Sequence, residues 1–400
     1  MTGLATRPLP LQGIRVLDLG RIYQGPYCGL LLALAGAEVV KIEEPTGEPA
    51  RAGGGAARTT VPFAMLNSNK RDITLNLKHP RGRELFLALV RDADVVIENF
   101  SPGALARMGL GADVLLEANP RLVYGAATGY GTEGPDRDQL AMDITIQAHS
   151  GVMSVTGFPD SPPVKAGVAF IDFLGGAHLY AGVVTALFER ERTGRGRVVD
   201  VAMIDTVFPT LASNLSAFYR DGVAPRAGNG HGGGALVPYN VYPASDGHVA
   251  IIVVTEPQWR NLCTAMDRPE LAADERFRSN GRRYHHQGDL DRVIGDWTRS
   301  LRRDDVLARL RAAKVPAAAV REVGEVVADR HLHERGAVTR TRHPRLGEVV
   351  LPNSPLRFRD TPLAELEASP DLGADNEVIY GGWLGLSKDD LAGLRAEGVI

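Results

Sequence analysis

The first forty residues alternate apolar segments with turn-forming residues in a pattern typical of a βαβ unit. Apolar runs at residues 14–19 and 38–43 predict two strands. Between them, Pro26 precedes the apolar segment 27–35 and Gly36 follows it, as expected at the two ends of a helix. Strands joined by a crossover helix pair in parallel, so the pattern predicts a parallel sheet with a right-handed connection.

The same alternation continues toward the middle of the chain. It predicts further strands at residues 71–77, 93–98 and 122–127, and helices at residues 81–91 and 112–118. A long loop rich in Gly, Pro and Arg is expected at residues 45–62. Strands that alternate with helices indicate an α/β fold with a doubly wound, Rossmann-like sheet. In such sheets, ligands bind beside the carboxyl ends of the strands.

The pattern changes after residue 206 and predicts a second, smaller α+β domain. A glycine-rich segment at residues 228–234 precedes strand-like residues and a charged, largely helical region. The expected parts are a large domain in residues 1–200, a linker in 201–225, a small domain in 226–325, and a linker with a C-terminal segment in 326–400. Near the C-terminus, Ser387 is expected to cap a helix.

Composition narrows the class of protein. Apolar residues make up 44% and charged residues 23% of the 400 residues, which is the balance of a soluble globular enzyme. The net charge of −3 argues against non-specific nucleic-acid binding. Two cysteines exclude a disulfide framework and favour a reducing, cytoplasmic location, and the N-terminal residues lack the apolar core of a signal peptide.

One apolar stretch, residues 167–188, contains a single formal charge, Asp172. We expect a buried strand followed by a buried helix there, rather than a membrane span. A charge inside an apolar run needs a partner or a function. Aspartate is common as a helix N-cap, and it can also be a catalytic carboxylate. The two interpretations are compatible, because backbone N–H groups at a helix start favour an ionised carboxylate.

Several common chemistries lack their motifs. The glycine segment 228–234 is not followed by Gly-Lys-Ser/Thr, so it is not a P-loop, and the helix after the first strand lacks the dinucleotide-binding glycines. A flexible lid and a plain interdomain linker both remain open for this segment. No Gly-x-Ser-x-Gly is present, which argues against a serine hydrolase. The histidines at 285–286 and 331–333 lack supporting ligands, so no metal site is expected.

An ordered set of phrases resembles the class III CoA-transferase family, which includes formyl-CoA transferases, carnitine CoA-transferases and α-methylacyl-CoA racemases. The phrases are Gly13-Ile-Arg-Val-Leu-Asp-Leu, Gly36-Ala-Glu-Val-Val-Lys-Ile-Glu, Asn69-Lys-Arg, Glu98-Asn-Phe-Ser-Pro-Gly-Ala-Leu-Ala-Arg-Met-Gly, Gln147-Ala-His-Ser-Gly-Val-Met-Ser-Val-Thr-Gly and Arg192-Thr-Gly-Arg-Gly-Arg. The resemblance implies a large Rossmann-like domain built from both chain ends, with residues 326–400 returning to it, and an interlocked homodimer. It also implies acyl-CoA and a small carboxylic acid as substrates, with no tightly bound cofactor and no metal.

The resemblance also assigns residues. Asp172 takes the position of the family's aspartate nucleophile, which would form an aspartyl anhydride and then an aspartyl-CoA thioester. The residues implied to contact CoA are Tyr23, Gln24, Leu75, Asn76, Leu77, Lys78, Asn99, Phe100, Arg107, Leu140, Met142 and Asp143. The family's mobile glycine loop corresponds to Gly232, Gly233 and Gly234, next to His231.

Two positions depart from the family pattern. An arginine that contacts CoA in formyl-CoA transferases corresponds here to Glu44, and a histidine of the racemases corresponds to Met142. Methionine cannot exchange protons, so this position disfavours a racemase. The alternatives to a CoA-transferase are therefore an α-methylacyl-CoA racemase and a catalytically silent CoA-binding protein.

Overall fold

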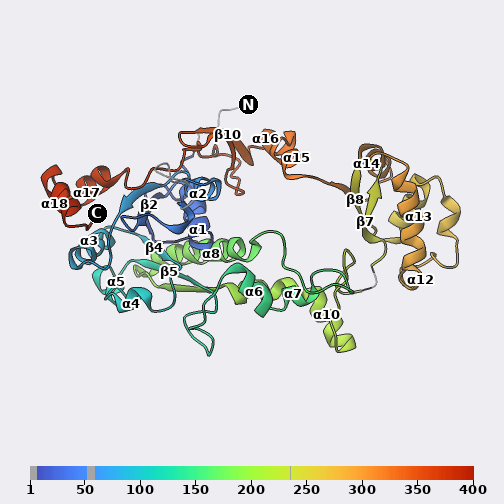
Figure 1. Cartoon of the computed structure of the whole chain (residues 1–400), viewed down its shortest axis with the longest axis horizontal. Helices are drawn as coiled ribbons and strands as arrows, with labels where there is room; N and C mark the ends of the chain where they lie inside the picture. The colour runs from blue at the N-terminus through green and yellow to red at the C-terminus, as the bar shows by residue number, and fades with distance from the viewer. Residues whose placement is uncertain (1–6, 52–58, 235) are drawn as a thin grey trace. The chain divides into compact units, whose positions relative to one another are not determined.

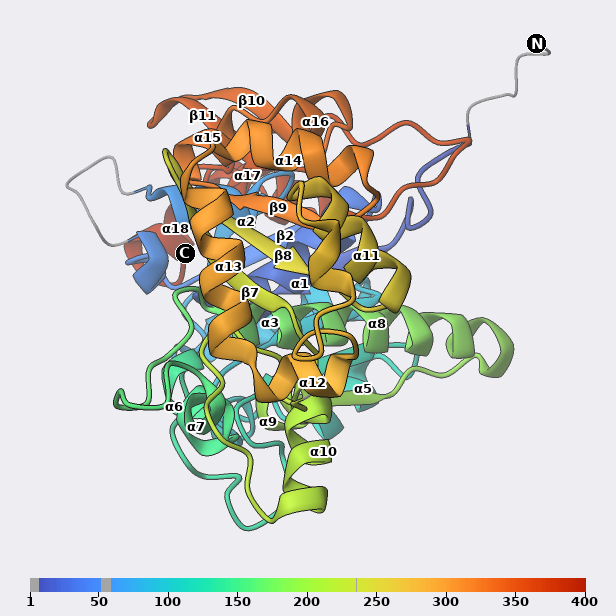
Figure 2. The same cartoon turned by 90° about the vertical axis from the view of Figure 1, so that its right-hand side faces the viewer.

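The chain, described by a computed structural model over residues 7–51, 59–234 and 236–400, forms two compact units (Figures 1 and 2). The first unit comprises Met1–Ile146, Val168–Val207 and Asp329–Ile400, and the second comprises Gln147–Gly167 and Phe208–Ala328. The second unit thus includes residues 147–167 and 208–225, which the sequence pattern assigned to the large domain and to a linker.

A six-stranded parallel sheet forms the centre of the first unit, as the sequence pattern predicts. Its strands lie in the order β3-β2-β1-β4-β5-β6, and every neighbouring pair is parallel. The strands are β1 (Arg15–Asp18), β2 (Glu38–Glu43), β3 (Arg71–Thr74), β4 (Val95–Glu98), β5 (Val123–Thr128) and β6 (Val198–Ala202). The direction of the strand order reverses between β1 and β4, and this switch point is where doubly wound sheets bind ligands.

Alternate side chains of the strands enter two hydrophobic cores, one on each face of the sheet. Val16 and Val95 belong to one core, with α1 and α8, whereas Leu17 and Val96 belong to the other. The helices of these two layers are α1 (Gln24–Leu34) and α8 (Phe170–Thr193) on the first face, and α3 (Pro80–Arg91), α5 (Ala112–Ala118), α17 (Asn376–Leu384) and α18 (Lys388–Ala396) on the second. Figure 1 shows α1 and α8 together beside the sheet.

The C-terminal segment returns to the first unit and packs beside β3. The Tyr380 hydroxyl donates a hydrogen bond to the carbonyl of Thr74 at 2.8 Å. The backbone N–H of Asp72 donates to the Asp375 carboxylate at 2.9 Å. The first unit is therefore built from both ends of the chain, as the family resemblance implies. Ser387 caps α18 in a capping box with Asp390, as predicted.

The predicted strand at the start of residues 167–188 is wrong, because the whole stretch from Phe170 onward is the helix α8. A short apolar run does not distinguish a buried strand from a buried helix. The N-cap of α8 is Ala169 and Asp172 is the third helical residue, so the interpretation of Asp172 as the N-cap is also wrong. By length and composition α8 could cross a membrane. Here it packs against α1, β5 and β6.

The second unit has a three-stranded antiparallel sheet covered by helices (Figure 2). Trp259, Phe277 and Ile294 are among the buried side chains between the sheet and the helices. Its strands are β7 (Tyr239–Ala244), β8 (Gly247–Ile252) and β9 (Ala317–Val320), and its larger helices are α10 (Ala212–Asp221), α11 (Glu256–Ala265), α12 (Asn280–His285), α13 (Gln287–Arg299) and α14 (Arg303–Ala312). Helix α10 lies within the predicted linker.

Shorter elements connect these layers. They are the 3₁₀ turns η1 (Pro49–Arg51), η3 (Phe208–Leu211) and η4 (Pro269–Ala272), the helices α2 (Val61–Asn67), α4 (Ala104–Arg107), α6 (Asp143–His149), α7 (Val152–Val155), α9 (Met203–Val207), α15 (Val323–Val327) and α16 (Arg330–Glu334), and the antiparallel hairpin β10 (Val338–His343) and β11 (Gly347–Pro352). The predicted loop at residues 45–62 contains η1, and part of it, residues 52–58, lies outside the described residues.

Candidate functional site

Asp172 lies in the first turn of α8, where the backbone N–H groups have no partners within the helix. A second carboxylate satisfies two of these groups. Asp143 Oδ2 accepts hydrogen bonds from the N–H of Ile171 at 2.9 Å and from the N–H of Asp172 at 3.3 Å. Asp143 therefore does for α8 what a local N-cap side chain usually does, and the Asp172 carboxyl is left outside this interaction.

The Asp172 carboxyl is half-buried, and its pKa is raised from 3.8 to about 7. Burial, which disfavours the charged form, is the larger cause, and the negative charge of Asp143 is the second. Perturbed carboxyl groups of this kind are frequent at catalytic sites.

Gln24, at the start of α1, packs against the helix that carries Asp172. A Cβ atom placed on Gly175, one turn after Asp172, would lie 2.6 Å from Gln24 Nε2. A larger residue at this position would have to displace the Gln24 amide. Gln24 Nε2 is buried, and within the described part of the chain it has no hydrogen-bond partner. Next to it, the Tyr23 ring stacks on Phe173, with 6.0 Å between the ring centroids. The predicted residues Tyr23 and Gln24 thus contact the turn of α8 that bears Asp172.

At the switch point, the loop after β1 is joined to the loop after β4. The Arg21 N–H donates to Asn99 Oδ1 at 2.7 Å, and Asn99 Nδ2 donates to the carbonyl of Arg21 at 2.9 Å. The Arg21 guanidinium lies 4.7 Å from the centroid of the Phe100 ring. The predicted residues Asn99 and Phe100 therefore lie at the carboxyl end of β4, beside the β1–α1 loop (residues 19–23).

A cavity of about 220 Å³ opens at the carboxyl ends of β1, β2 and β3. It is lined by Leu19, Arg21, Ile42, Glu43, Glu44, Leu75, Leu77, Lys78, Phe100 and Met108. Its rim is charged: Glu44 Oε1 accepts from Lys78 Nζ at 3.2 Å and from Arg21 Nη2 at 3.3 Å. Four predicted CoA contacts, Leu75, Leu77, Lys78 and Phe100, line this one cavity. Arg21 and Met108, which the family resemblance does not assign to CoA, line it as well.

Eight predicted contacts do not line this cavity. Three of them are Tyr23, Gln24 and Asn99, described above, and the other five lie elsewhere. Asn76 directs its amide to the carbonyl of Gly398, and Arg107 donates to the carbonyl of Pro102 in its own loop. Leu140 and Met142 are exposed, at 83% and 57%, just before α6. Asp143 caps α8 instead. These side chains share no single pocket.

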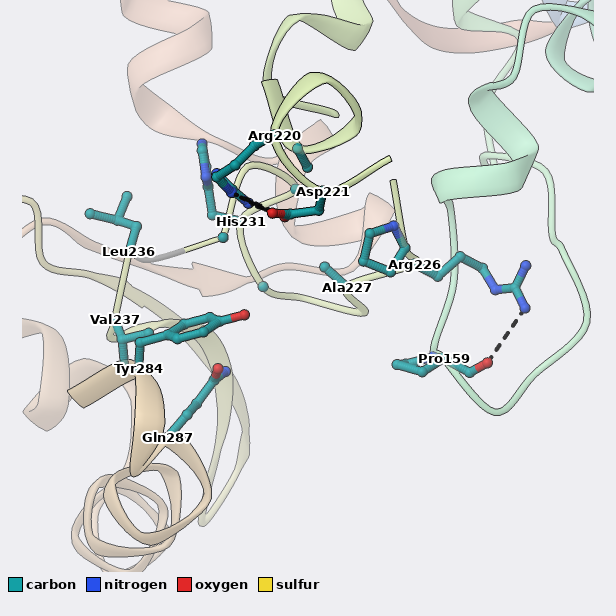
Figure 3. A pocket seen from close by; sticks show the side chains of 15 residues that line it. Pro159, Arg220, Asp221, Arg226, Ala227, His231, Leu236, Val237, Tyr284 and Gln287 are labelled. Atoms are coloured by element: carbon teal, nitrogen blue, oxygen red, sulfur yellow. Dashed lines mark hydrogen bonds and ion pairs between the residues drawn. The ribbon is translucent and has the colours of Figure 1, made fainter. Parts of the chain in front are cut away.

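The glycine segment belongs to the second unit, where it borders a cavity of about 360 Å³ (Figure 3). Gly232 and Gly234 line this cavity with His231 and Arg220. Arg220 Nη1 donates to the carbonyl of Gly233 at 3.2 Å, and the Gly233 N–H donates to His231 Nδ1 at 3.3 Å. Gly234 has φ +73°, which other residues rarely adopt. These hydrogen bonds hold the glycine segment in the conformation described here.

Two buried groups near the site escaped the sequence analysis. Lys70 is buried and donates to Asp18 Oδ2 at 2.7 Å. Glu98, the last residue of β4, accepts from the Phe100 N–H at 2.6 Å and from the Tyr124 hydroxyl at 2.9 Å. Burial raises the pKa of Glu98 from 4.5 to about 7. Among the described residues, no group of three or more His, Cys, Asp or Glu is arranged to hold a metal ion.

Comparison with known proteins places these features in context. The sequence profile of CoA-transferase family III matches residues 11–376. Formyl-CoA:oxalate CoA-transferase of Streptomyces coelicolor is 38% identical over 98% of this chain and 99% of its own length. Succinyl-CoA–D-citramalate CoA-transferase of Chloroflexus aurantiacus is 36% identical, with 98% of both chains covered. A crystal structure of a CaiB/BaiF family protein from Brucella suis has a TM-score of 0.84 and 35% identity, over 94% of this chain and 100% of that one.

Proposed function

The chain belongs to CoA-transferase family III, and from this premise we propose that it transfers CoA through a covalent intermediate on Asp172. The enzyme class follows from the family: CoA moves between an acyl-CoA and a carboxylic acid. The observation that carries the covalent step is the Asp172 carboxyl, which is half-buried and has a pKa raised to about 7. It lies on the turn of α8 against which Gln24 and Tyr23 pack.

In the proposed reaction, the Asp172 carboxylate attacks the thioester carbonyl of the donor. The C–S bond breaks, and the products are an aspartyl–acyl anhydride and the CoA thiolate. The thiolate then attacks the aspartyl carbonyl, which forms an aspartyl-CoA thioester and releases the donor acid as a carboxylate. The acceptor carboxylate repeats both steps in reverse order. One thioester is broken and one is made, so no proton or electron is gained or lost over the cycle.

The raised pKa of Asp172 is compatible with this role. At pH 7, a carboxyl with a pKa of about 7 is about half ionised, which costs only about twofold in the reactive form. Partial burial carries a benefit, because anhydrides and thioesters hydrolyse when water reaches them. Partial burial therefore lowers the ionised fraction of Asp172 by a small factor and protects the covalent intermediate from hydrolysis.

The Gln24 amide is proposed to donate a hydrogen bond to the negative charge that develops on the attacked carbonyl oxygen during transfer. Its Nε2 is buried, has no partner among the described residues, and lies against the helix turn after Asp172. A preorganised donor of this kind stabilises an oxyanion formed from the attacked carbonyl. We therefore assign Gln24 to the reacting end of the substrate and Tyr23 to the adjacent wall.

The switch-point cavity is the proposed site for the nucleotide end of CoA. Its floor is apolar, formed by Leu75, Leu77 and Phe100, which suits an adenine ring. Lys78 and Arg21 at its rim supply positive charge for phosphates, and Glu44 holds both cations in place. The β1–α1 loop connects this cavity to Tyr23 and Gln24, so one substrate could contact both.

Short-chain acids are the proposed substrates. The relatives' names give oxalate, citramalate, formyl-CoA and succinyl-CoA, all of them short acids or their thioesters. We further propose that a glycine lid at Gly232–Gly234 limits the access of water while the acids exchange.

We also propose that the protein is a cytoplasmic homodimer. Both cysteines are buried and free, which suits a reducing compartment. Apolar side chains such as Phe188 and Val168 are exposed and available for a partner subunit.

The variant Asp172→Ala tests the nucleophile directly. Transfer between succinyl-CoA or formyl-CoA and a panel of short dicarboxylates is expected to fall by about 10³-fold or more. CoA binding, measured by calorimetry, is expected to change little because the carboxyl is not assigned to the nucleotide. Substantial transfer by the folded variant would contradict the assignment. If the wild-type protein binds CoA but transfers it to none of the acids, it is a silent CoA-binding protein.

A further inference from the structure

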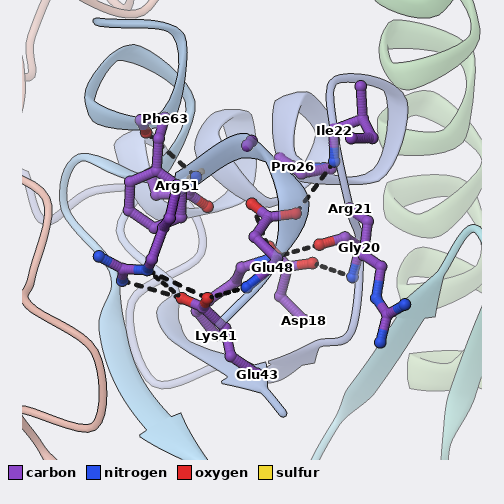
Figure 4. Close-up of polar contacts among 12 residues, drawn as sticks. Asp18, Gly20, Arg21, Ile22, Pro26, Lys41, Glu43, Glu48, Arg51 and Phe63 are labelled. Carbon is purple, nitrogen blue, oxygen red and sulfur yellow. Dashed lines mark hydrogen bonds and ion pairs between the residues drawn. The ribbon is translucent and has the colours of Figure 1, made fainter. Parts of the chain in front are cut away.

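Beneath the β1–α1 loop lies a buried ion pair that the proposed reaction does not use. Lys41, in β2, and Glu48, in the following loop, have side chains only 1% and 2% exposed, and Lys41 Nζ lies 3.4 Å from Glu48 Oε1. Lys41 Nζ donates to the carbonyl of Gly20, and Glu48 Oε2 accepts from the Ile22 N–H at 3.1 Å. Figure 4 shows Glu48 between Lys41 and the loop.

We propose that the Lys41–Glu48 pair positions the β1–α1 loop for CoA transfer by holding Gly20 from one side and Ile22 from the other. The inference rests on the proposed function, because it concerns the loop that joins the nucleotide cavity to the reacting end. Lys41 and Glu48 touch no reacting atom in this account and are positioning residues.

The conformation of Ile22 shows that the loop needs holding. Ile22 has φ +64°, in the left-handed region that β-branched residues rarely adopt. Such a conformation persists only where the surroundings determine it, and it is most frequent at functional sites. The N–H of Ile22, bound by Glu48, is the group that this conformation turns toward the buried pair.

The loop also connects the two halves of the site. On one side of Ile22, Arg21 bonds to Asn99 and lines the cavity. On the other side, Tyr23 stacks on Phe173 and Gln24 packs against Gly175. A change of conformation at Ile22 would therefore alter the distance between the nucleotide cavity and the Asp172 turn.

Stability alone is a weak reason for this arrangement. Burying two charges is costly, and well-packed apolar residues of similar size often stabilise a fold as much. Several buried ionic groups surround the pair. The Glu48 N–H donates to Glu43 Oε2, and Arg51 binds both Glu43 and Asp72. These contacts fix the segment that carries Glu48, so the carboxylate acts from a rigid base.

The substitution Glu48→Gln tests the proposal with little change in volume. Two donors, Lys41 Nζ and the Ile22 N–H, face the Glu48 carboxylate, and a glutamine can offer an acceptor to only one of them. We expect the affinity for CoA and kcat/KM to fall about tenfold to hundredfold, because small misplacements of a site are costly. The matched control is Glu38→Gln, which changes an exposed glutamate of β2, the strand that carries Lys41, and it should retain wild-type values.

A second substitution separates positioning from loss of folding. Glycine adopts positive φ without strain, so adding Ile22→Gly to Glu48→Gln should recover most of the CoA affinity. Wild-type CoA binding by the folded Glu48→Gln protein, or no recovery in the double variant, would overturn the proposal. CoA affinity is measured without turnover, so this test gives an answer even if Asp172 is not the nucleophile.

Discussion

The carboxylate of Asp143 accepts a hydrogen bond from the backbone N–H of Asp172 at 3.3 Å, across 29 residues of sequence. One acidic residue thus caps the helix whose first turn carries the other. The contact satisfies the helix terminus. Burial is the larger cause of the raised pKa of the Asp172 carboxyl, and the negative charge of Asp143 raises it further. The proposed nucleophile is therefore tuned by a residue that it does not need for its own chemistry.

Removing the charge of residue 143 should shift the pH dependence of transfer. In Asp143→Asn, the amide oxygen still accepts from the helix N–H groups, but the negative charge that raises the pKa of Asp172 is gone. The pKa of Asp172 falls, so the ionised form persists to lower pH. The acid limb of kcat/KM, expected near pH 7 in the wild type, should move downward.

Asp138→Asn is the matched control for this measurement, since Asp138 is an exposed acid of the preceding segment. Its pH profile should overlay that of the wild type. An acid limb that stays in place in a folded Asp143→Asn protein would show that Asp143 does not tune the reactive group.

Glu98 should make the protein less stable as the pH rises. Its pKa is raised in the folded state from 4.5 to about 7, so the folded protein holds this proton more strongly than the unfolded chain does. The stabilisation is complete below pH 4.5 and is lost as the pH rises through about 7, with a magnitude of about 3 kcal/mol.

Urea unfolding of Glu98→Gln and wild type isolates this contribution. The difference in unfolding free energy, variant minus wild type, should rise by about 3 kcal/mol from pH 4.5 to above pH 7. Glu84→Gln, at an exposed glutamate of α3, is the control. A difference that is the same at every pH would refute the buried, protonated Glu98.

The glycine segment is predicted to limit hydrolysis. A side chain at Gly233 would place Cβ 3.1 Å from the His231 ring and 3.3 Å from the carbonyl oxygen of Ser213, so Gly233→Val should displace the segment. We expect slower transfer, a larger fraction of acyl-CoA lost to hydrolysis, or both. Gly288→Val, where an added Cβ meets nothing within 4 Å, is the control. Unchanged rates for both reactions in Gly233→Val would remove the lid.

The protein is not expected to exchange α-protons. A racemase needs two acid–base groups beside the α-carbon, and the position where racemases have histidine is here the exposed Met142. Incubation of 2-methylacyl-CoA in deuterium oxide without an acceptor acid should leave the α-hydrogen in place, as judged by mass spectrometry. Rapid uptake of deuterium would assign the racemase reaction instead.

Local signals predicted the framework well. The strand at residues 38–43 has the bounds of β2, the strands of the large unit are parallel, and Ser387 caps α18. Each of these depends on patterns within a few residues. The predicted CoA contacts Tyr23, Gln24, Leu75 and Phe100 came from the family resemblance, and they lie beside the switch point or the Asp172 turn.

The features that the sequence did not predict depend on residues that are distant along the chain. The cap of α8 comes from Asp143, so the sequence around residue 169 contains no capping signal, and its apolar pattern predicts a strand before the helix. Lys41 and Glu48 look like ordinary strand and loop residues. Only the fold brings them beneath Gly20 and Ile22 and buries both charges. Helix α10 lies in the segment predicted as a linker, and its apolar side chains Phe218 and Tyr219 are exposed.

Asp172 is proposed to carry a covalent anhydride and then a CoA thioester during turnover. Wild-type enzyme should be mixed with succinyl-CoA or another accepted donor, quenched during turnover, digested and analysed by mass spectrometry. We expect added mass, corresponding to CoA or the acyl group, on the peptide that contains Asp172, and none in Asp172→Ala. Active transfer with no added mass on that peptide would contradict it.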